Sequence, residues 1–352
     1  MEEIIFKTIL VLALFLLSMG VAAYSTWAER KVAALLQDRV GPNRAGFWGL
    51  LQPLADGGKF FFKEDFIPKN AEKFLFILGP GLVMFISLIT GAIIPWGKTL
   101  NIGGQSFDLQ VANIDVGVLY LLGMVSVGVY GVMIGGWASN NKYSLMGAIR
   151  ASSQMISYEL AMGLALLSII LMNGSLDLKI ITENQTIGKF YGIVEINGLN
   201  WNIFYQPLAF VIFFTAALAE CNRHPFDLSE CETELVGGFH TEYSSMKLGL
   251  YLFGEYVNMF ISCALITTLF LGGYNFPGLS WIGENWGENW EGIFSIMVFL
   301  TKTFSLIFVF MWIRWTLPRF RYDQLMHLGW KILIPLALVN LLITGGVLLM
   351  LS

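Results

Sequence analysis

Charged residues are scarce in this sequence. Asp, Glu, Lys and Arg make up 13% of its 352 residues, whereas hydrophobic residues make up 56%. Soluble domains carry about 25% charged residues, so this composition argues against a soluble enzyme. The formal net charge of −4 is close to balance, and it gives no sign of the basic surface by which proteins bind nucleic acid.

Residues that hold redox cofactors are also few. The sequence has three cysteines, which form no CxxC pair: Cys221, Cys231 and Cys263. All three histidines fall between the hydrophobic runs: His224, His240 and His327. An iron–sulfur cluster usually needs four thiolates, and a membrane haem needs histidines inside helices. No phosphate-binding glycine loop or dinucleotide fingerprint occurs either, so the chain is expected to hold no redox centre of its own.

Long hydrophobic runs dominate the sequence. Each is roughly 20 residues, enough for a helix to cross about 30 Å of hydrocarbon. The runs are apolar throughout and show no alternation, which indicates helices rather than barrel strands. We therefore predict an all-α polytopic membrane protein with about eight transmembrane helices in a single membrane domain, residues 1–352. The runs are 4–24, 73–94, 115–138, 152–173, 203–219, 248–271, 292–315 and 330–350.

The ends of the chain and its basic loops predict an orientation. The first run is preceded by MEE rather than by basic residues, so it is expected to be a retained helix and not a signal peptide. Sixteen of the 21 Lys and Arg residues lie in the loops after the first, third, fifth and seventh runs. Basic loops stay on the inner side of the membrane, so both termini are predicted to be outside.

The first inner loop, residues 25–72, is amphipathic. Ala28, Val32 and Leu35 recur at helical spacing with charges between them, and a second apolar set follows the helix-breaking GPN at 41–43. Such segments are expected to lie in the plane of the membrane. Their spacing favours a surface anchor, and the alternative is the wall of a cavity open to lipid.

Four ionisable residues stand inside or at the end of hydrophobic runs: Glu159, Glu220, Glu255 and Lys302. A charge at the centre of a membrane helix costs about 2.5–3.5 kcal/mol, so such residues usually face the interior of a bundle or a water-filled path. They could mark a pathway for protons, or they could form structural pairs, for instance Lys302 with one of the glutamates.

Two further inner loops are notable, residues 219–247 and 314–331. The first contains AECNRHPFDLSECETELVGGFHTEY, with six carboxylates and a single arginine, Arg223. A solvated acidic loop is the usual meaning of such a run. The alternative is that its acids fold back toward the membrane and join Glu159 and Glu255 in a buried, partly hydrated chain. The other loop contains PRFRYDQLMH, which fits either simple inner-side anchoring or the docking of a partner.

Four long blocks in order, 29–65, 136–160, 219–243 and 312–331, carry a resemblance that covers nearly the whole chain. They resemble the H-subunit family of bacterial NADH:quinone oxidoreductase, respiratory complex I. The resemblance implies a protein of the inner (plasma) membrane that contacts the peripheral arm and the antiporter-like membrane subunits. It implies quinone as the substrate bound by this chain, with FMN and the iron–sulfur clusters in other subunits.

The resemblance also implies roles for individual residues. Those expected at the quinone tunnel are Glu29, Arg30, Arg39 and Asp56. Those expected to dock the peripheral arm are Arg319, Arg321 and Asp323. Those expected to couple quinone reduction to proton movement are Glu159, Glu220, Arg223, Asp227, Glu230, Glu232, Glu234 and Glu255, and Lys302 is added to them from its place inside a hydrophobic run.

Other classes of protein remain open at this point. A component of a ferredoxin-linked or hydrogenase-type complex would share the fold and differ in the electron donor. A stand-alone cation antiporter would explain the buried charges, but it predicts an inverted repeat, and none is apparent in the sequence. A purely structural anchor would have no need of Glu159 or Glu255.

Overall fold

The computed structural model describes residues 2–102, 104–186, 189–190, 194–195, 200–228 and 235–351. Seven helices in these ranges are long and apolar enough to cross a membrane. They match seven of the predicted runs and confirm a helical, polytopic membrane protein. They are α1 (Glu2–Leu36), α3 (Lys73–Thr90), α4 (Gly117–Ala138), α5 (Lys142–Asn173), α10 (Ser245–Phe270), α12 (Glu288–Thr316) and the continuous unit of α13 (Tyr322–His327), the π-helical η4 (Leu328–Leu333) and α14 (Ile334–Leu351).

The remaining predicted run, 203–219, forms a shorter helix, α8 (Pro207–Glu220), of 14 residues. At about 1.5 Å per residue it is about 21 Å long, less than the thickness of the hydrocarbon. Pro207 begins the helix because the first turn needs no backbone N–H donor. The side chain of Gln206, just before it, is bonded to Asn340 at 2.9 Å and Thr344 at 2.8 Å on α14.

Short elements connect the long helices. The short α-helices are α2 (Gln52–Phe62), α6 (Leu178–Asn184), α7 (Asn202–Tyr205) and α11 (Leu279–Trp286). Three 3-10 turns are η1 (Phe47–Gly49), η2 (Gly91–Ile93) and η3 (Gly238–His240). Two small antiparallel hairpins pair β1 (Leu100–Ile102) with β2 (Gln105–Phe107) and β3 (Lys189–Phe190) with β4 (Val194–Glu195).

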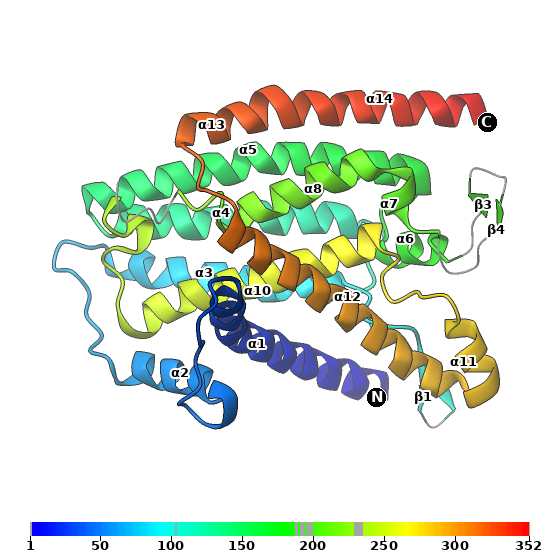
Figure 1. Ribbon diagram of the computed structural model, residues 1–352, viewed down its shortest axis with the longest axis horizontal. Coiled ribbons are helices and arrows are strands. Elements are labelled where there is room, and N and C mark those ends of the chain that lie inside the picture. The colour runs from blue at the N-terminus through cyan, green and yellow to red at the C-terminus, as the bar shows by residue number, and fades with distance from the viewer. Residues whose placement is uncertain are drawn as a thin grey trace.

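Helix α10 occupies the middle of the bundle, between α3 on one side and α1 with α12 on another, while α14 lies along α5 at the far edge (Figure 1). Glycines let α3, α4 and α10 approach closely. A Cβ on Gly135 would lie 1.9 Å from the hydroxyl of Tyr251, which donates a hydrogen bond to the carbonyl of Gly131 at 3.0 Å. Small residues of this kind are the usual contact surface between membrane helices.

The inner loop after the first run differs from its prediction. Residues 25–36 continue α1 without a break, so α1 has 35 residues and a length of about 52 Å. The second amphipathic segment is a separate helix, α2, beside the C-terminal end of α1 (Figure 1). Phe61 and Phe62 of α2 are exposed, as is Leu54. This exposed apolar face suits a helix that rests against lipid.

Candidate functional site

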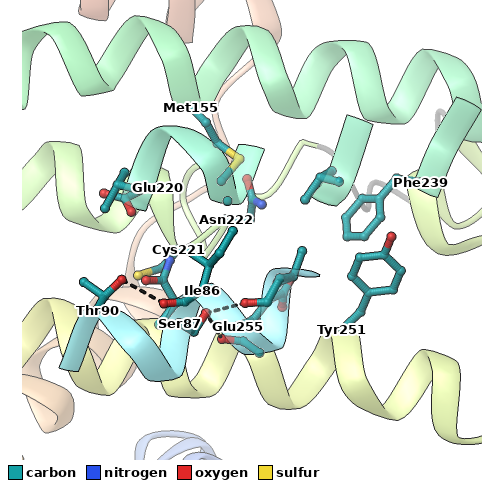
Figure 2. A pocket seen from close by; sticks show the side chains of 16 residues that line it. Ile86, Ser87, Thr90, Met155, Glu220, Cys221, Asn222, Phe239, Tyr251 and Glu255 are labelled. Atoms are coloured by element: carbon teal, nitrogen blue, oxygen red, sulfur yellow. Dashed lines mark hydrogen bonds between the residues drawn. The ribbon is translucent and has the colours of Figure 1, made fainter. Parts of the chain in front are cut away.

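A buried cavity lies where α3, α4, α5, α8 and α10 meet. Glu220 from the end of α8 and Glu255 from α10 both line it (Figure 2). The cavity offers the centres of water molecules a volume of about 40 Å³. A single buried water molecule needs about 10–15 Å³ of such volume. The cavity therefore has room for a few water molecules beside the two carboxylates. Its other polar lining residues are Ser87, Thr90, Cys221, Asn222, Tyr251 and Asn258.

The end of α8 is held in place by Gln154 of α5. The side-chain amide of Gln154 donates hydrogen bonds to the carbonyls of Ala219 and Phe226, each at 2.8 Å. Gln154 is buried, so these bonds are shielded from competing water. They fix both the last turn of α8 and the loop that follows it. Glu220 is thereby kept at the cavity wall rather than on the protein surface.

Glu159 lies close to Glu220 although the two come from different helices. The hydroxyl of Ser126 on α4 donates a hydrogen bond to the Glu159 carboxylate. Glu159 is near enough to Glu220 for their charges to repel, and the Asn258 side chain is hydrogen-bonded to Glu220. Three helices besides α8 thus contribute to one polar group.

Arg223 connects Glu255, in the wall of the cavity, to Tyr256 and through it to Glu29 of α1. Its guanidinium lies 3.6 Å from the Glu255 carboxylate and 4.1 Å from the centre of the Tyr256 ring. The Tyr256 hydroxyl in turn donates a hydrogen bond of 2.8 Å to Glu29 of α1. Arg314 of α12 also pairs with the Glu29 carboxylate. A continuous series of polar contacts therefore runs from the cavity to α1.

The predicted tunnel residues divide into two sets. Glu29 is buried, and the next residue, Arg30, forms an ion pair of 3.0 Å with Asp56 of α2. Gln52, one turn earlier in α2, donates a hydrogen bond to Asp56 at 3.1 Å. The structure thus joins Arg30 to Asp56 where α1 meets α2, whereas Glu29 is held by Arg314 and Tyr256. Arg39 is exposed and bonds to Gln37, so it does not join them.

The loop predicted to dock the peripheral arm, residues 314–331, contacts the segment after α8. Arg319 lies 3.3 Å from the Asp227 carboxylate and donates a hydrogen bond of 3.1 Å to His224. Burial of the imidazole, together with the charges of Arg319 and Arg314, lowers the pKa of His224 below 6.5. His224 is therefore neutral near pH 7 and can accept that hydrogen bond. Arg321 and Asp323 are exposed at the start of α13.

Helix α8 ends at Glu220, so Arg223 and His224 do not lie on its helical face, although a spacing of three and four residues from Glu220 would allow it. They are placed instead by the turn that follows. Of the acids predicted in this loop, Glu220 and Asp227 are described and buried. Glu230, Glu232 and Glu234 lie outside the described residues.

Lys302 stands apart from the carboxylates. Its ammonium donates to the backbone carbonyls of Leu271, Gly273 and Asn275 at 2.6–2.9 Å. It also lies 4.5 Å from the centre of the Trp201 ring. These contacts cap the end of α10 that is remote from the inner loops. A cation there complements the helix dipole.

Several residues of this site are not apparent from the sequence. Arg314 resembles any other inner-side base, yet it pairs with Glu29 near the opposite end of the chain. Tyr256 and Asn258 could have been found from the sequence, because they are polar residues close to Glu255 within an apolar run. Gln154 could have been found in the same way in the run 152–173. Among the described residues, no group of three or more His, Cys, Asp or Glu side chains could hold a metal ion.

Comparison with known proteins identifies relatives over the full chain. The family described as NADH dehydrogenase matches residues 8–345. The H subunit of the NADH-quinone oxidoreductase of Flavobacterium psychrophilum is 58% identical over 99% of this chain and 98% of its own length. An H subunit of the same enzyme from Cytophaga hutchinsonii is also 58% identical, over 99% and 98% respectively. One from Geobacter metallireducens is 47% identical over 95% of this chain and 93% of its own.

Proposed function

The chain belongs to the H-subunit family of NADH-quinone oxidoreductase, and from that premise we propose that it walls the quinone-binding site and couples quinone reduction to proton translocation. As a multi-pass membrane component of that complex, it works with the other subunits. The electrons come from them, and quinone is the substrate that this chain contacts. The coupling is carried by its buried carboxylates.

The proposed quinone site lies where α1 meets α2. Arg30 and Asp56 are paired with each other, and Glu29, next to Arg30 in the chain, is paired with Arg314. A polar head group could be oriented by these charges while an isoprenoid tail follows the exposed apolar face of α2. Helix α2 would then form the rim through which the tail reaches the lipid.

The proposed coupling path starts at Glu29. A change of charge or position of the quinone would alter the electrostatic field at Glu29, and the Tyr256–Arg223 contact would relay that change to Glu255. Glu255 and Glu220 share a cavity with room for water, and Glu159 adjoins Glu220. Burial of Glu220 and Glu255 disfavours their charged forms, and the charge of Glu159 repels that of Glu220. The set would therefore take up or release protons as the field changes and bias the pumping subunits beyond it.

The docking role is proposed for residues 314–331. Arg319 is tied to the segment after α8, whereas Arg321 and Asp323 present exposed charges at the same end of the bundle. Exposed arginine and carboxylate groups form directed, charge-assisted hydrogen bonds with complementary partners. The peripheral arm would be held at this surface.

A single observation carries the coupling proposal: Glu220 and Glu255 line one cavity, and Glu159 is near enough to Glu220 for their charges to repel. The test is Glu159→Gln in the assembled complex, reconstituted in proteoliposomes. The amide keeps the shape and removes the titratable group. We expect proton pumping and coupled quinone reductase activity to fall together by about tenfold, as for loss of one charge-assisted contact, with normal assembly on native gels.

Glu284→Gln, at an exposed glutamate on α11, is the matched control and should behave as the parent complex. If Glu159→Gln assembles and pumps at the parental rate and stoichiometry, Glu159 is not a required link. A loss of assembly is separated from a loss of coupling by the oxidation of NADH with artificial acceptors, which does not involve this chain.

A further inference from the structure

One face of α12 is exposed along the length of the helix. Its exposed residues recur every three or four positions, which is the spacing of a single helical face. Between the tryptophans at its two ends they are Ile293, Met297, Thr301, Phe304, Ser305 and Phe308. The charged residues of this stretch lie elsewhere, since Glu291 is buried and the Lys302 ammonium is bonded to backbone carbonyls. The exposed face therefore carries no charge.

The two hydroxyl groups on this face are satisfied within α12 itself. Thr301 donates a hydrogen bond to the carbonyl of Met297 at 2.7 Å, and Ser305 donates to that of Thr301 at 2.8 Å. A polar group without such a partner costs several kcal/mol in hydrocarbon. The side chains of Ile293, Met297 and Phe304 on the same face are large, whereas contacts between membrane helices favour small residues. The face therefore suits lipid better than another helix.

Tryptophans mark both ends of this face. From position 290 to positions 312 and 315 there are 22 and 25 residues, so Trp312 and Trp315 lie about 33 and 38 Å along the helix from Trp290. At about 3.6 residues per turn they return to the side of Trp290, and all three are exposed. Helix α12 is inclined to α5 and α14 (Figure 1), and a tilt shortens the distance that it covers across a membrane. The interval therefore matches about 30 Å of hydrocarbon, with tryptophan at both interfaces, where it is enriched.

Helix α11 extends the tryptophan-rich surface at the N-terminal end of α12. Gly287 joins the two helices with a φ of 101°, a left-handed conformation in which the chain can turn sharply. Helix α11 therefore lies across the end of α12 and at a steep angle to α5 (Figure 1). Its Trp281 and Trp286 are exposed, and the Trp286 ring lies 6.4 Å from the ring of Trp290. A helix of this kind has the form of one that lies in a membrane interface.

The first turn of α12 is held in place by the β1–β2 hairpin and the residues before it. Lys98 forms an ion pair of 2.6 Å with Glu291, and the backbone N–H of Asn101 donates to the Asn289 side chain at 2.8 Å. Trp290 stands between Asn289 and Glu291 in the chain. These contacts therefore fix its position relative to the bundle, and Trp290 marks one level of the molecule reliably.

We propose that lipid acyl chains, and not another subunit, cover this face of α12 in the assembled complex. The tryptophans at its ends then lie in the two headgroup regions, which offer acceptors for their indole N–H groups. Helix α11 lies in the interface at the N-terminal end of α12. Thr301, midway between Trp290 and Trp312, lies at the middle of the bilayer. This assignment does not rest on the proposed quinone and coupling roles.

The first experiment uses the whole complex in native membranes. Phe304 is replaced with its photoreactive analogue p-benzoylphenylalanine, which on illumination forms a carbon–carbon bond with a neighbouring C–H group. Mass spectrometry should then find phospholipid attached at position 304, and denaturing gels should show no band that joins this chain to another subunit. The matched control has the same replacement at Phe299, which is fully buried on the same helix with its ring 5.3 Å from that of Trp96. It should give no phospholipid adduct.

A second measurement does not depend on any substitution. The parent complex is placed in nanodiscs of dioleoyl phosphatidylcholine, with and without bromine added across the acyl double bonds, and both are imaged by electron cryomicroscopy. The brominated sample should show added density along α12 between Trp290 and Trp312. The two headgroup layers should cross α12 at its terminal tryptophans, and α11 should lie within one of them.

The contrary results are as clear. The proposal is overturned if a cross-link from position 304 joins another subunit, or if a protein chain packs against Phe304 in the density map. Equal phospholipid adducts at positions 304 and 299 would overturn it too, because the label would not report which face meets lipid. Headgroup layers that cross α12 near Thr301, or an α11 that stands clear of them in water, would contradict the assignment of the tryptophans.

Discussion

At the scale of single residues, the site depends on buried charges that each have several partners. Glu29 is buried with both Arg314 and the Tyr256 hydroxyl against it. Removing one partner from a buried ion pair typically destabilises a protein by about 3–5 kcal/mol because a charge is left uncompensated. Glu29, Arg314 and Arg223 are therefore poor places to test function, since their variants would disturb the fold as well. Partly exposed charged residues near this site are better places to test function.

Asp56 is such a residue, because its ion pair with Arg30 is partly exposed to solvent. We predict that Asp56→Leu lowers the reduction of long-tailed quinone by about tenfold, as expected for a lost charge-assisted contact. Oxidation of NADH with artificial acceptors should stay nearly intact, because that reaction does not reach this chain. Asp38→Asn, at an exposed aspartate in the same inner loop, serves as the control. Equal loss of both activities would indicate misassembly.

At the scale of helices, the sequence predicts where the membrane is crossed better than where helices end. Hydrophobic runs mark the part of a helix that lies in lipid. The helix itself continues for as long as its backbone N–H and C=O groups have hydrogen-bond partners. Helix α5 starts at Lys142, ten residues before the run 152–173, with the Asn141 side chain accepting from the Tyr143 N–H at 2.9 Å. Helix α1 runs on to Leu36 for the same reason.

Contacts between helices are less accessible from the sequence. The glutamates inside hydrophobic runs can be singled out, because their cost in lipid demands an explanation. Their partners cannot, since the pairing of Glu29 with Arg314 depends on how α1 and α12 cross. Lys302 shows the same limit. Its sequence context suggests a carboxylate partner, but the end of α10 offers it three carbonyls.

The contact between the segment after α8 and the last inner loop should depend on pH. The pKa of His224 is lowered by burial and by Arg319 and Arg314, so His224 accepts from Arg319 when it is neutral. A lowered pKa means that this stabilisation, about 1 kcal/mol for one hydrogen bond, is complete above pH 6.5 and is lost as the pH falls through the lower folded-state value.

His224→Asn replaces the imidazole by a neutral amide that does not titrate. We predict that the midpoint of thermal unfolding of the purified complex falls on acidification less in this variant than in the parent. At pH 7.5 the parent should be at least as stable as the variant. At pH 5.5 the variant should be the more stable of the two. A constant difference between the two across this range would show that His224 does not titrate against Arg319.

At the scale of the whole molecule, the two ends of the bundle have different chemistry. One end carries α2, the segment after α8 and the basic loop 314–331, with the carboxylate cavity beneath them. The other carries the hairpins, α6, α11 and the Lys302 contacts (Figure 1). The distribution of lysine and arginine predicts that the first end faces the inner side of the membrane. The proposed quinone and docking roles both depend on this polarity.

The polarity can be measured by labelling single cysteines. Cys221 and Cys263 are buried and should not react, and Cys231, which lies outside the described residues, is replaced by serine. Glu3→Cys near the N-terminus and Lys142→Cys at the start of α5 both place a thiol at an exposed position. We predict that a membrane-impermeant maleimide added to intact cells labels Glu3→Cys, whereas Lys142→Cys, in the basic loop after the third run, reacts only after permeabilisation. The reverse pattern would place the basic loops outside and separate them from the peripheral arm that they are proposed to dock. Labelling of both thiols after permeabilisation confirms that neither is covered in the complex, so a missing signal in intact cells then reports the side of the membrane.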